Sequence, residues 1–530
     1  MTVLIRDLRL SLDEEEALLL PKAAKRLQLP PDALRNLRIR RSSLDARKKS
    51  DIHFQYTVTL DAPSEQKLLS KALPGVEAAP VLDAAPPKPG TLPLLGRPVV
   101  VGAGPAGMFA ALTLAREGYR PLILERGVPV EERAGRVETF WNGGPLDPQC
   151  NVLFGEGGAG TFSDGKLTTR IKDPRCQLVL DDLVRFGAPP ECAYAAKPHI
   201  GTDILRTIVA RVREEVLSLG GEYCFHTRLT GLQLKNGTLC AVETNHGPIE
   251  TNACILAVGH SARDVYQMLL EKGLNLRAKP FAAGVRVEHP QSMIDLSQYG
   301  KLAGHPRLGA AEYHLAAKDG ARGVYTFCMC PGGQVVASSS EEGGVVTNGM
   351  SFHARDGQNA NAAVVVQVGP EDFGGGPLDG MRFQQAMELS AFAAGGKNYF
   401  APAQRVGDFL RRQPSRAFSA VQPSYRPGVT PCDLHAVLPG VIAHGLAAAL
   451  PRFGQMLRGY DMEDAVLTGV ETRTSSPVRI EREETGMAAG ALGLYPAGEG
   501  AGYAGGIVSA AVDGLNSARK LVERFAPPAV

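Results

Sequence analysis

Length, composition and charge exclude several classes of protein. The chain has 530 residues, too many for one hydrophobic core, so several domains are expected. Hydrophobic residues make up 44% and charged residues 21%, as in soluble globular domains, and the formal net charge of +2 gives no overall electrostatic case for nucleic acid or membrane. The nine cysteines are an odd number without a C-x-x-C motif, so a disulfide framework is not expected.

Two features predict a cytoplasmic protein without membrane contact. The first residues contain no apolar signal core. The apolar stretch GVIAHGLAAAL, residues 440–450, is too short to span a bilayer and contains a histidine. The composition therefore favours a reducing compartment, and it predicts no particular oligomeric state.

Residues 1–73 are predicted to form a small α+β domain. The segment VLIRDLRLSL alternates like a strand, and the next residues, 14–29, form an amphipathic helix with acids in its first turn. Two further strands and a second helix follow. Residues 74–94 contain six prolines among alanine and glycine, which is typical of a partly extended linker.

The rest of the chain predicts one nucleotide-binding domain interrupted by another domain. Residues 95–270 run strand, helix, strand, glycine-rich loop and helix. Short strands dominate residues 271–460, which we expect to form a β-rich substrate or cap domain with helices. Residues 461–530 return to glycine-rich loops and a helix. The predicted fold class is α/β, with a Rossmann-like domain interrupted by a β-rich α+β substrate domain, plus the small N-terminal α+β domain.

A glycine-rich turn carries the functional prediction. In PVVVGAGPAGMFAALTLAREGYRPLILERG, Gly102, Gly104 and Gly107 follow a strand and open a helix with dinucleotide-binding spacing. Gly102 permits the tight turn, Gly104 lets a pyrophosphate approach the backbone, and Gly107 lets the helix lie against the strand. Pro105 suits the first helical turn, whose free N–H groups face the phosphates.

The residue at the end of the second strand limits which dinucleotides are expected to bind. Glu125 stands there, where a carboxylate accepts hydrogen bonds from ribose hydroxyls and repels a 2′-phosphate. The ligand is therefore expected to be FAD or NAD rather than NADP.

Two later segments favour FAD over NAD, because the longer FAD needs distant parts of the chain to hold its flavin end. Residues 253–264 read as a strand that ends at Gly259. In residues 494–515 a strand leads to Gly498 and Glu499 and then to a helix that opens at Gly506. Glu499 is suited to a ribitol hydroxyl, and the helix N-terminus is suited to the flavin pyrimidine ring, where reduced flavin carries negative charge.

These motifs resemble the FAD domain of glutathione-reductase-type flavoproteins. Further segments, among them FGEGGAGTFSDGKL, KPHIGTD, AVGHSARD, FCMCPGG, NGMSFHARDGQNAN and GVETRTSSPVRI, are similar to a group of largely uncharacterised bacterial FAD-dependent dehydrogenases. The resemblance covers nearly the whole chain and implies non-covalent FAD. Together with Pro105 and Gly498 of the two turns, it implies cofactor contacts at Gly102, Gly104, Ala106, Gly107, Glu125, Arg126, Gly158, Gly160, Gly259, Glu499, Gly506 and Ile507.

No second strand–glycine turn–helix unit lies between residues 128 and 500, and no redox C-x-x-C is present. Disulfide reductases with a separate NAD(P)H domain are therefore disfavoured. We expect an FAD-dependent oxidoreductase that moves a hydride between a small organic substrate and flavin N5, with NAD(P)H as a transient reductant or the organic substrate as the electron source.

Several charged residues are candidates for the substrate cleft. Arginines near a flavin suit a substrate carboxylate, and a histidine suits acid–base work, although structural ion pairs explain such residues equally well. The candidates are Arg286, His289, His353, Arg355 and Arg473.

Three other features have a functional and a structural interpretation. Cys328 and Cys330 form C-x-C on a predicted strand; a redox or metal pair is one reading, but two small buried residues on one strand face are favoured. Lys166 is expected to be solvated rather than near the flavin. No metal site is predicted.

Residues 35–49 hold seven basic residues against one acid. This run suits a solvated strand edge protected by charge, while RNA contact is the alternative. Two alternative functions stay open: an FAD-dependent RNA-modifying enzyme that uses this basic domain, and a non-enzymatic flavin-binding redox sensor.

Overall fold

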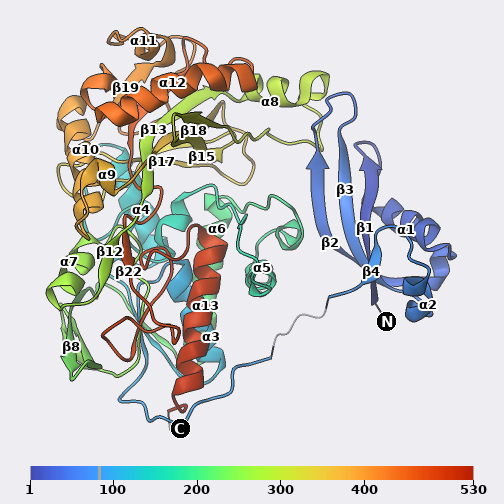
Figure 1. The fold of residues 1–530 in the computed structure, drawn as a ribbon, viewed down its shortest axis with the longest axis horizontal. Coiled ribbons are helices and arrows are strands. Elements are labelled where there is room, and N and C mark those ends of the chain that lie inside the picture. Colours follow the sequence, from blue (N-terminus) through green and yellow to red (C-terminus); the bar gives the residue numbers. More distant parts are fainter. Residues whose placement is uncertain (1, 81–84, 529–530) are drawn as a thin grey trace.

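The computed structural model describes residues 2–80 and 85–528 (Figure 1). Three sheets organise these residues: an N-terminal antiparallel sheet, a parallel Rossmann-like sheet, and a seven-stranded sheet of the second domain. The predicted α/β class, with a β-rich second domain and a small N-terminal domain, is confirmed. Within the described residues, every helix is too short or too polar to traverse a bilayer.

The N-terminal domain has four strands in the order β2-β3-β1-β4, where three were predicted. The additional strand, β4, lies within residues 74–94, which were expected to be linker throughout. Apolar side chains of β1 and β3 alternate onto helices α1 and α2, which explains the small core. The elements are β1 (Thr2–Ser11), α1 (Leu19–Leu27), β2 (Arg35–Asp45), β3 (His53–Asp61), α2 (Glu65–Ser70) and β4 (Val76–Ala78).

Backbone pairing ties this domain to the rest of the chain. The Ser42 N–H of edge strand β2 donates to the Tyr194 carbonyl at 2.8 Å, and the Ala196 N–H returns a bond to Ser42 at 2.7 Å. Further along, Gly90 donates to the Val522 carbonyl at 2.8 Å. Part of the proline-rich segment is therefore fixed against the C-terminal helix.

The Rossmann-like sheet has the order β23-β11-β5-β6-β7, with all neighbours parallel. Its central strands are short and buried, because helices cover one face and α7 with the small antiparallel sheet covers the other. Helices α3 and α13 pack together over one face, as Figure 1 shows. The elements are β5 (Val99–Val101), α3 (Pro105–Arg116), β6 (Leu122–Leu124), α4 (Val130–Trp141), α5 (Arg175–Arg185), α6 (Thr202–Ser218), β7 (Glu222–Cys224), β11 (Cys254–Leu256), α7 (Arg263–Glu271), β23 (Leu494–Pro496) and α13 (Ile507–Arg524).

A small antiparallel sheet, β10-β9-β8, flanks the Rossmann-like unit, and the pair β12-β22 connects it to the second domain. These strands are β8 (Leu229–Lys235), β9 (Thr238–Thr244), β10 (Gly247–Glu250), β12 (Leu276–Ala278) and β22 (Val478–Ile480).

The second domain is built on the sheet β14-β15-β18-β13-β21-β19-β20, antiparallel except for the β19-β20 pair. Its central strands are buried on both faces, and α12 packs across it (Figure 1). Strand β21 belongs to this sheet, so the second domain continues past residue 460, where its end was expected. The strands are β13 (Phe281–Pro290), β14 (Ala316–Asp319), β15 (Arg322–Cys330), β18 (Asn359–Val368), β19 (Ala401–Arg405), β20 (Val429–Pro431) and β21 (Val466–Glu471).

Five helices and a separate hairpin complete the second domain. Helix α12 begins at Gly440, directly after Pro439. The elements are α8 (Gln291–Tyr299), the hairpin β16 (Gln334–Ala337) and β17 (Thr347–Met350), α9 (Pro370–Phe373), α10 (Asp379–Gly395), α11 (Val406–Leu410) and α12 (Gly440–Met456).

Candidate functional site

One deep cavity of about 630 Å³ lies between the Rossmann-like sheet and the second domain. Residues just beyond the carboxyl ends of β5, β6, β11 and β23 line one side, and side chains of the second domain line the other. Ligands of parallel α/β sheets bind at this sheet edge, and the volume is within the range of small-molecule sites.

The glycine turn after β5 has three distinct spatial requirements. Gly102 has φ +98°, and a methyl group there would lie 2.4 Å from the Ala257 carbonyl oxygen. A methyl on Gly107 would lie 1.8 Å from the Gly102 carbonyl oxygen. A methyl on Gly104 would meet no atom closer than the Gly158 Cα at 3.8 Å. Packing therefore requires Gly102 and Gly107, whereas Gly104 borders open space in the cavity.

Glu125 follows β6 and is buried at the cavity edge. Its carboxylate accepts the backbone N–H groups of Ala103 at 2.9 Å, Gly127 at 2.9 Å and Gly155 at 3.0 Å. A carboxylate has about four acceptor positions, so one remains for a ribose hydroxyl. Glu125 thus also holds the glycine turn and the loop at 155 together, a role that the sequence did not predict.

A buried arginine shapes the glycine-rich loop that follows α4. Arg133 is fully buried and donates to the carbonyl oxygens of residues 151, 152, 155, 156 and 158, at 2.6–3.2 Å. Burial lowers its pKa to about 10. The loop that Arg133 anchors brings Gly158 against Gly104 across the cavity.

Two helices begin at the cavity. Helix α3 starts at Pro105 and helix α13 at Ile507, and both residues line the cavity. Unpaired N–H groups and the helix dipole make these ends favourable for negative charge. Glu499, which precedes α13, also lines the cavity, and burial raises its pKa to about 7 against the opposing charge of Lys279.

The structure brings most of the predicted cofactor residues together. Gly107 and Gly498 do not line the cavity: Gly107 supports the turn, and the Gly498 N–H donates to Asp513 at 2.7 Å. Twelve of the fourteen do line it: Gly102, Gly104, Pro105, Ala106, Glu125, Arg126, Gly158, Gly160, Gly259, Glu499, Gly506 and Ile507.

The predicted substrate residues are mostly outside the cavity lining. Arg473 lines it, while its guanidinium pairs with Glu388 at 3.0 Å. Arg286 and His289 are fully buried in β13, because both faces of that strand are covered, and His289 bonds the Tyr460 carbonyl at 2.6 Å.

The other two candidates lie in the segment after β17. His353 stacks on His199, with ring centroids 5.1 Å apart. Arg355 is directed toward the acids of a neighbouring network, not into the lined cavity.

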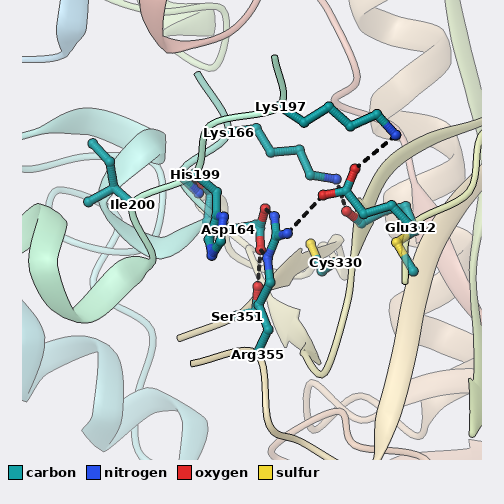
Figure 2. A network of polar contacts seen from close by, with 12 residues as sticks. Asp164, Lys166, Lys197, His199, Ile200, Glu312, Cys330, Ser351 and Arg355 are labelled. Atoms are coloured by element: carbon teal, nitrogen blue, oxygen red, sulfur yellow. Dashed lines mark hydrogen bonds and ion pairs between the residues drawn. The ribbon is translucent and has the colours of Figure 1, made fainter. Parts of the chain in front are cut away.

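This network, drawn in Figure 2, was not predicted as a site. Arg355 pairs with Asp164 and, at 2.8 Å, with Glu312, while Lys197 contacts Glu312 at 3.5 Å. Asp164, Lys197 and Glu312 line the cavity. Burial raises the pKa of Asp164, but Arg355 outweighs it and holds that pKa below its ordinary value. Asp164 and Lys197 lie in the FSDGK and KPHIG segments, so the resemblance was the available signal.

Lys166 was expected to be solvated, but it contacts the protein. Its ammonium donates to the Met329 carbonyl, and the residue lines the cavity, so it is not simply solvated.

Strand β15 is irregular near Met329. Phe327 pairs with Ala363 and Cys330 with Asn361, so β15 carries one extra residue, a β-bulge. The expectation that Cys328 and Cys330 share a regular strand face is therefore wrong. Among the described residues, no group of three or more His, Cys, Asp or Glu side chains forms a metal site.

Comparison with known proteins identifies the family. An uncharacterised protein of Clostridium beijerinckii is 48% identical over 532 aligned residues, covering 100% of both chains. The chain belongs to the family of that protein. Within it, residues 280–474 match the family model described as FAD-dependent protein, C-terminal domain-like, residues 100–131 match an NAD(P)-binding Rossmann-like domain, and residues 2–61 match a domain of unknown function.

More distant similarities are partial. Protein FixC of Escherichia coli K12 is 30% identical over 207 residues, which are 37% of this chain and 44% of FixC. The L-proline dehydrogenase of P. horikoshii is 12% identical over 82% of this chain and 96% of its own, with a TM-score of 0.33. Glycine oxidase of Bacillus cereus is 12% identical over 80% and 94%, with a TM-score of 0.32. These TM-scores are too low to add to the assignment.

The predicted family is confirmed. The chain has an FAD-dependent oxidoreductase-like fold, and its FAD-dependent C-terminal domain family indicates FAD binding.

Proposed function

We propose that this protein is an FAD-dependent oxidoreductase that moves a hydride between a small organic substrate and N5 of non-covalently bound FAD. One observation supports this most strongly. A single cavity is lined by the nucleotide turn at Gly102–Ala106, by the start of α13 at Gly505–Ile507, and by the second domain. A ligand bound there would contact both the nucleotide turn and the substrate domain.

The residues that line the cavity suit the phosphate, ribose and flavin groups of FAD. Gly104 leaves the backbone open to a pyrophosphate, and the start of α3 offers unpaired N–H groups to it. The free acceptor position of Glu125 suits a ribose hydroxyl. The start of α13 suits the pyrimidine side of a flavin, where negative charge develops on reduction. When bound, FAD supplies the redox chemistry.

Both domains contribute charged groups to the cavity that suit a substrate. Lys197 has a 69% exposed side chain at the cavity, held by the 3.5 Å contact with Glu312. An ammonium in this position suits a substrate carboxylate or other anionic group, and we propose that Lys197 binds it. The buried pair of Asp164 and Arg355 keeps Glu312 in place beside it.

Anaerobic reduction of the purified full-length protein tests this function. NADH and NADPH are added in turn, followed by a panel of small organic acids and amines, while the flavin absorbance is recorded. The proposal predicts rapid bleaching with a nicotinamide or with at least one organic compound. A bound flavin that no donor reduces faster than free flavin would contradict an enzymatic role and favour a sensor.

A further inference from the structure

Two thiols lie at the bulge of β15, beside the cavity. Cys328 lines the cavity, and Cys330 is fully buried behind it. Cys328 has φ +44°, a left-handed conformation that is rare for a non-glycine residue, because the bulge inserts one residue here. The Cys330 thiol donates to the Cys328 carbonyl at 3.4 Å. The bulge therefore turns the short C-x-C segment back on itself and brings the two residues together.

Two cations flank the pair. Arg286 is fully buried; its Nη2 lies 2.8 Å from the Cys328 carbonyl oxygen and 3.7 Å from the Cys330 sulfur. Lys166 donates to the carbonyl of Met329, the residue between the two cysteines. Cys330 and Lys166 appear with the Asp164 network in Figure 2. The acids nearby are already paired: Asp164 with Arg355, and Glu471 with Arg286 at 3.3 Å. These positively charged neighbours favour the thiolate form of a cysteine in the pair.

The protonation of Cys328 differs from that of the buried cysteines elsewhere. The neighbouring Cys330 lowers the pKa of Cys328, and Arg286 and Lys166 lower it further against the effect of burial, while the pKa of Cys330 itself is raised. Burial instead raises the pKa of Cys150, and it raises the pKa of Cys254 to about 12. The attacking form of a thiol is the thiolate, and Cys330, two residues further along the same bulge, carries the second sulfur.

The thiol pair shares its cavity with the proposed flavin end. A negative charge on Cys328 raises the pKa of Glu499, so the thiol lies within electrostatic range of the residue that precedes α13. Glu471, at the end of β21, lines the same cavity and feels the same charge. Cys328, Glu471 and Glu499 therefore all line the cavity to which we assign the flavin.

We propose that Cys328 and Cys330 form a reversible dithiol–disulfide pair that exchanges two electrons with the bound flavin. The inference rests on the proposed function. Oxidation breaks two S–H bonds and forms one S–S bond, and the two electrons and two protons pass to oxidised FAD, giving FADH2. In the reverse direction FADH2 returns them and opens the disulfide. A C-x-C disulfide closes a small ring, and strained disulfides have higher reduction potentials than structural ones, which favours reduction by the flavin.

An anaerobic dithionite titration of the air-oxidised, FAD-containing protein tests the pair. The wild type is expected to take up about two electrons per flavin beyond those of the flavin itself, since a disulfide is a two-electron couple. Cys328→Ser and Cys330→Ser are expected to take up the flavin electrons alone. Cys240→Ser is the matched control, because Cys240 lies on β9, away from the cavity, and is partly buried like Cys328.

Alkylation under denaturing conditions gives a second readout that is independent of activity. In the oxidised wild type, mass spectrometry of the peptide that carries both cysteines is expected to show an unalkylated disulfide, which becomes doubly alkylated after dithionite. Flavin-containing wild-type protein with both thiols alkylated before reduction, and with no additional electron uptake, would overturn the thiol pair and leave the proposed function standing. Protein without flavin would overturn the proposed function itself.

Discussion

Replacing Gly104 with alanine separates cofactor binding from folding. Gly104 has φ −78° and ψ −177°, a conformation open to any residue, and the added methyl would lie 3.8 Å from the Gly158 Cα. Neither strain nor a clash opposes the substitution in the cofactor-free protein. Its free energy of unfolding is expected to stay within about 0.5 kcal/mol of wild type, as for a substitution that disturbs no packed contact.

The same methyl group would occupy the space through which a pyrophosphate reaches the backbone N–H groups. Losing two hydrogen bonds to a charged phosphate costs about 3 kcal/mol or more at roughly 1.5–3 kcal/mol each. Because 1.4 kcal/mol corresponds to a factor of ten, Gly104→Ala is expected to weaken flavin binding by about 100-fold or more. Chemical denaturation of the cofactor-free protein and fluorescence titration with FAD measure the two quantities.

Two glycines serve as controls. Gly135 in α4 has no atom within 4 Å of an added methyl and lies away from the cavity, so Gly135→Ala should bind flavin as wild type does. Gly107→Ala should destabilise the fold by about 1–3 kcal/mol or more, because its methyl would lie 1.8 Å from a carbonyl oxygen. Wild-type flavin affinity in Gly104→Ala would refute our placement of the pyrophosphate.

Predictions for three further variants, Glu388→Gln, Arg133→Met and Glu125→Ala, concern stability. Burial raises the pKa of Glu388, but Arg473 and Arg263 outweigh it and hold the pKa at about 2, below the ordinary 4.5. The stabilisation from this carboxylate is therefore complete above pH 4.5 and is lost as the pH falls toward 2. At 1.36 kcal/mol per pH unit, this group alone should make the free energy of unfolding at pH 3 about 2 kcal/mol lower than at pH 6. Denaturant titrations of Glu388→Gln should lack this pH-dependent difference. The same pH profile in wild type and variant would disprove the low pKa of Glu388. Glu388→Gln should also cost about 3–5 kcal/mol at pH 7, since it removes the carboxylate that pairs with the buried Arg473 and leaves the buried Arg263 with Glu341 alone. Arg133→Met should destabilise by at least about 1–3 kcal/mol, measured by thermal unfolding, because buried carbonyls lose their donor; equal stability would show that water replaces it. Glu125→Ala should lose both stability and flavin, and a loss of flavin at full stability would mean that the three backbone bonds contribute little.

The local part of the site was predictable from the sequence. The turn at residues 102–107 is encoded by closely spaced glycines after a buried strand, and Glu125 follows the next strand. Short-range geometry determines such features, so the sequence predicted both the Rossmann-like unit and the sheet edge at which the cavity opens.

The second wall of the cavity was not predictable in the same way. Cys328, Glu312 and Asp164 come together through the packing of β15, the loop before β14 and the glycine-rich loop, and no local pattern marks those distances. Arg286 and His289 were named as substrate candidates from their chemistry alone, whereas β18, β21 and α12 enclose the strand that carries them. The bulge in β15 also has no glycine to mark it, since the left-handed residue is Cys328.

Identification of the bound cofactor tests the central claim most directly. Full-length protein is purified without added flavin, its visible spectrum is recorded, and the ligand is released by heat and identified by mass spectrometry. Our account predicts flavin absorbance, with about one FAD per chain released intact, as expected for non-covalent binding. A colourless protein that also fails to bind added FAD, or one that releases NAD instead, would contradict it.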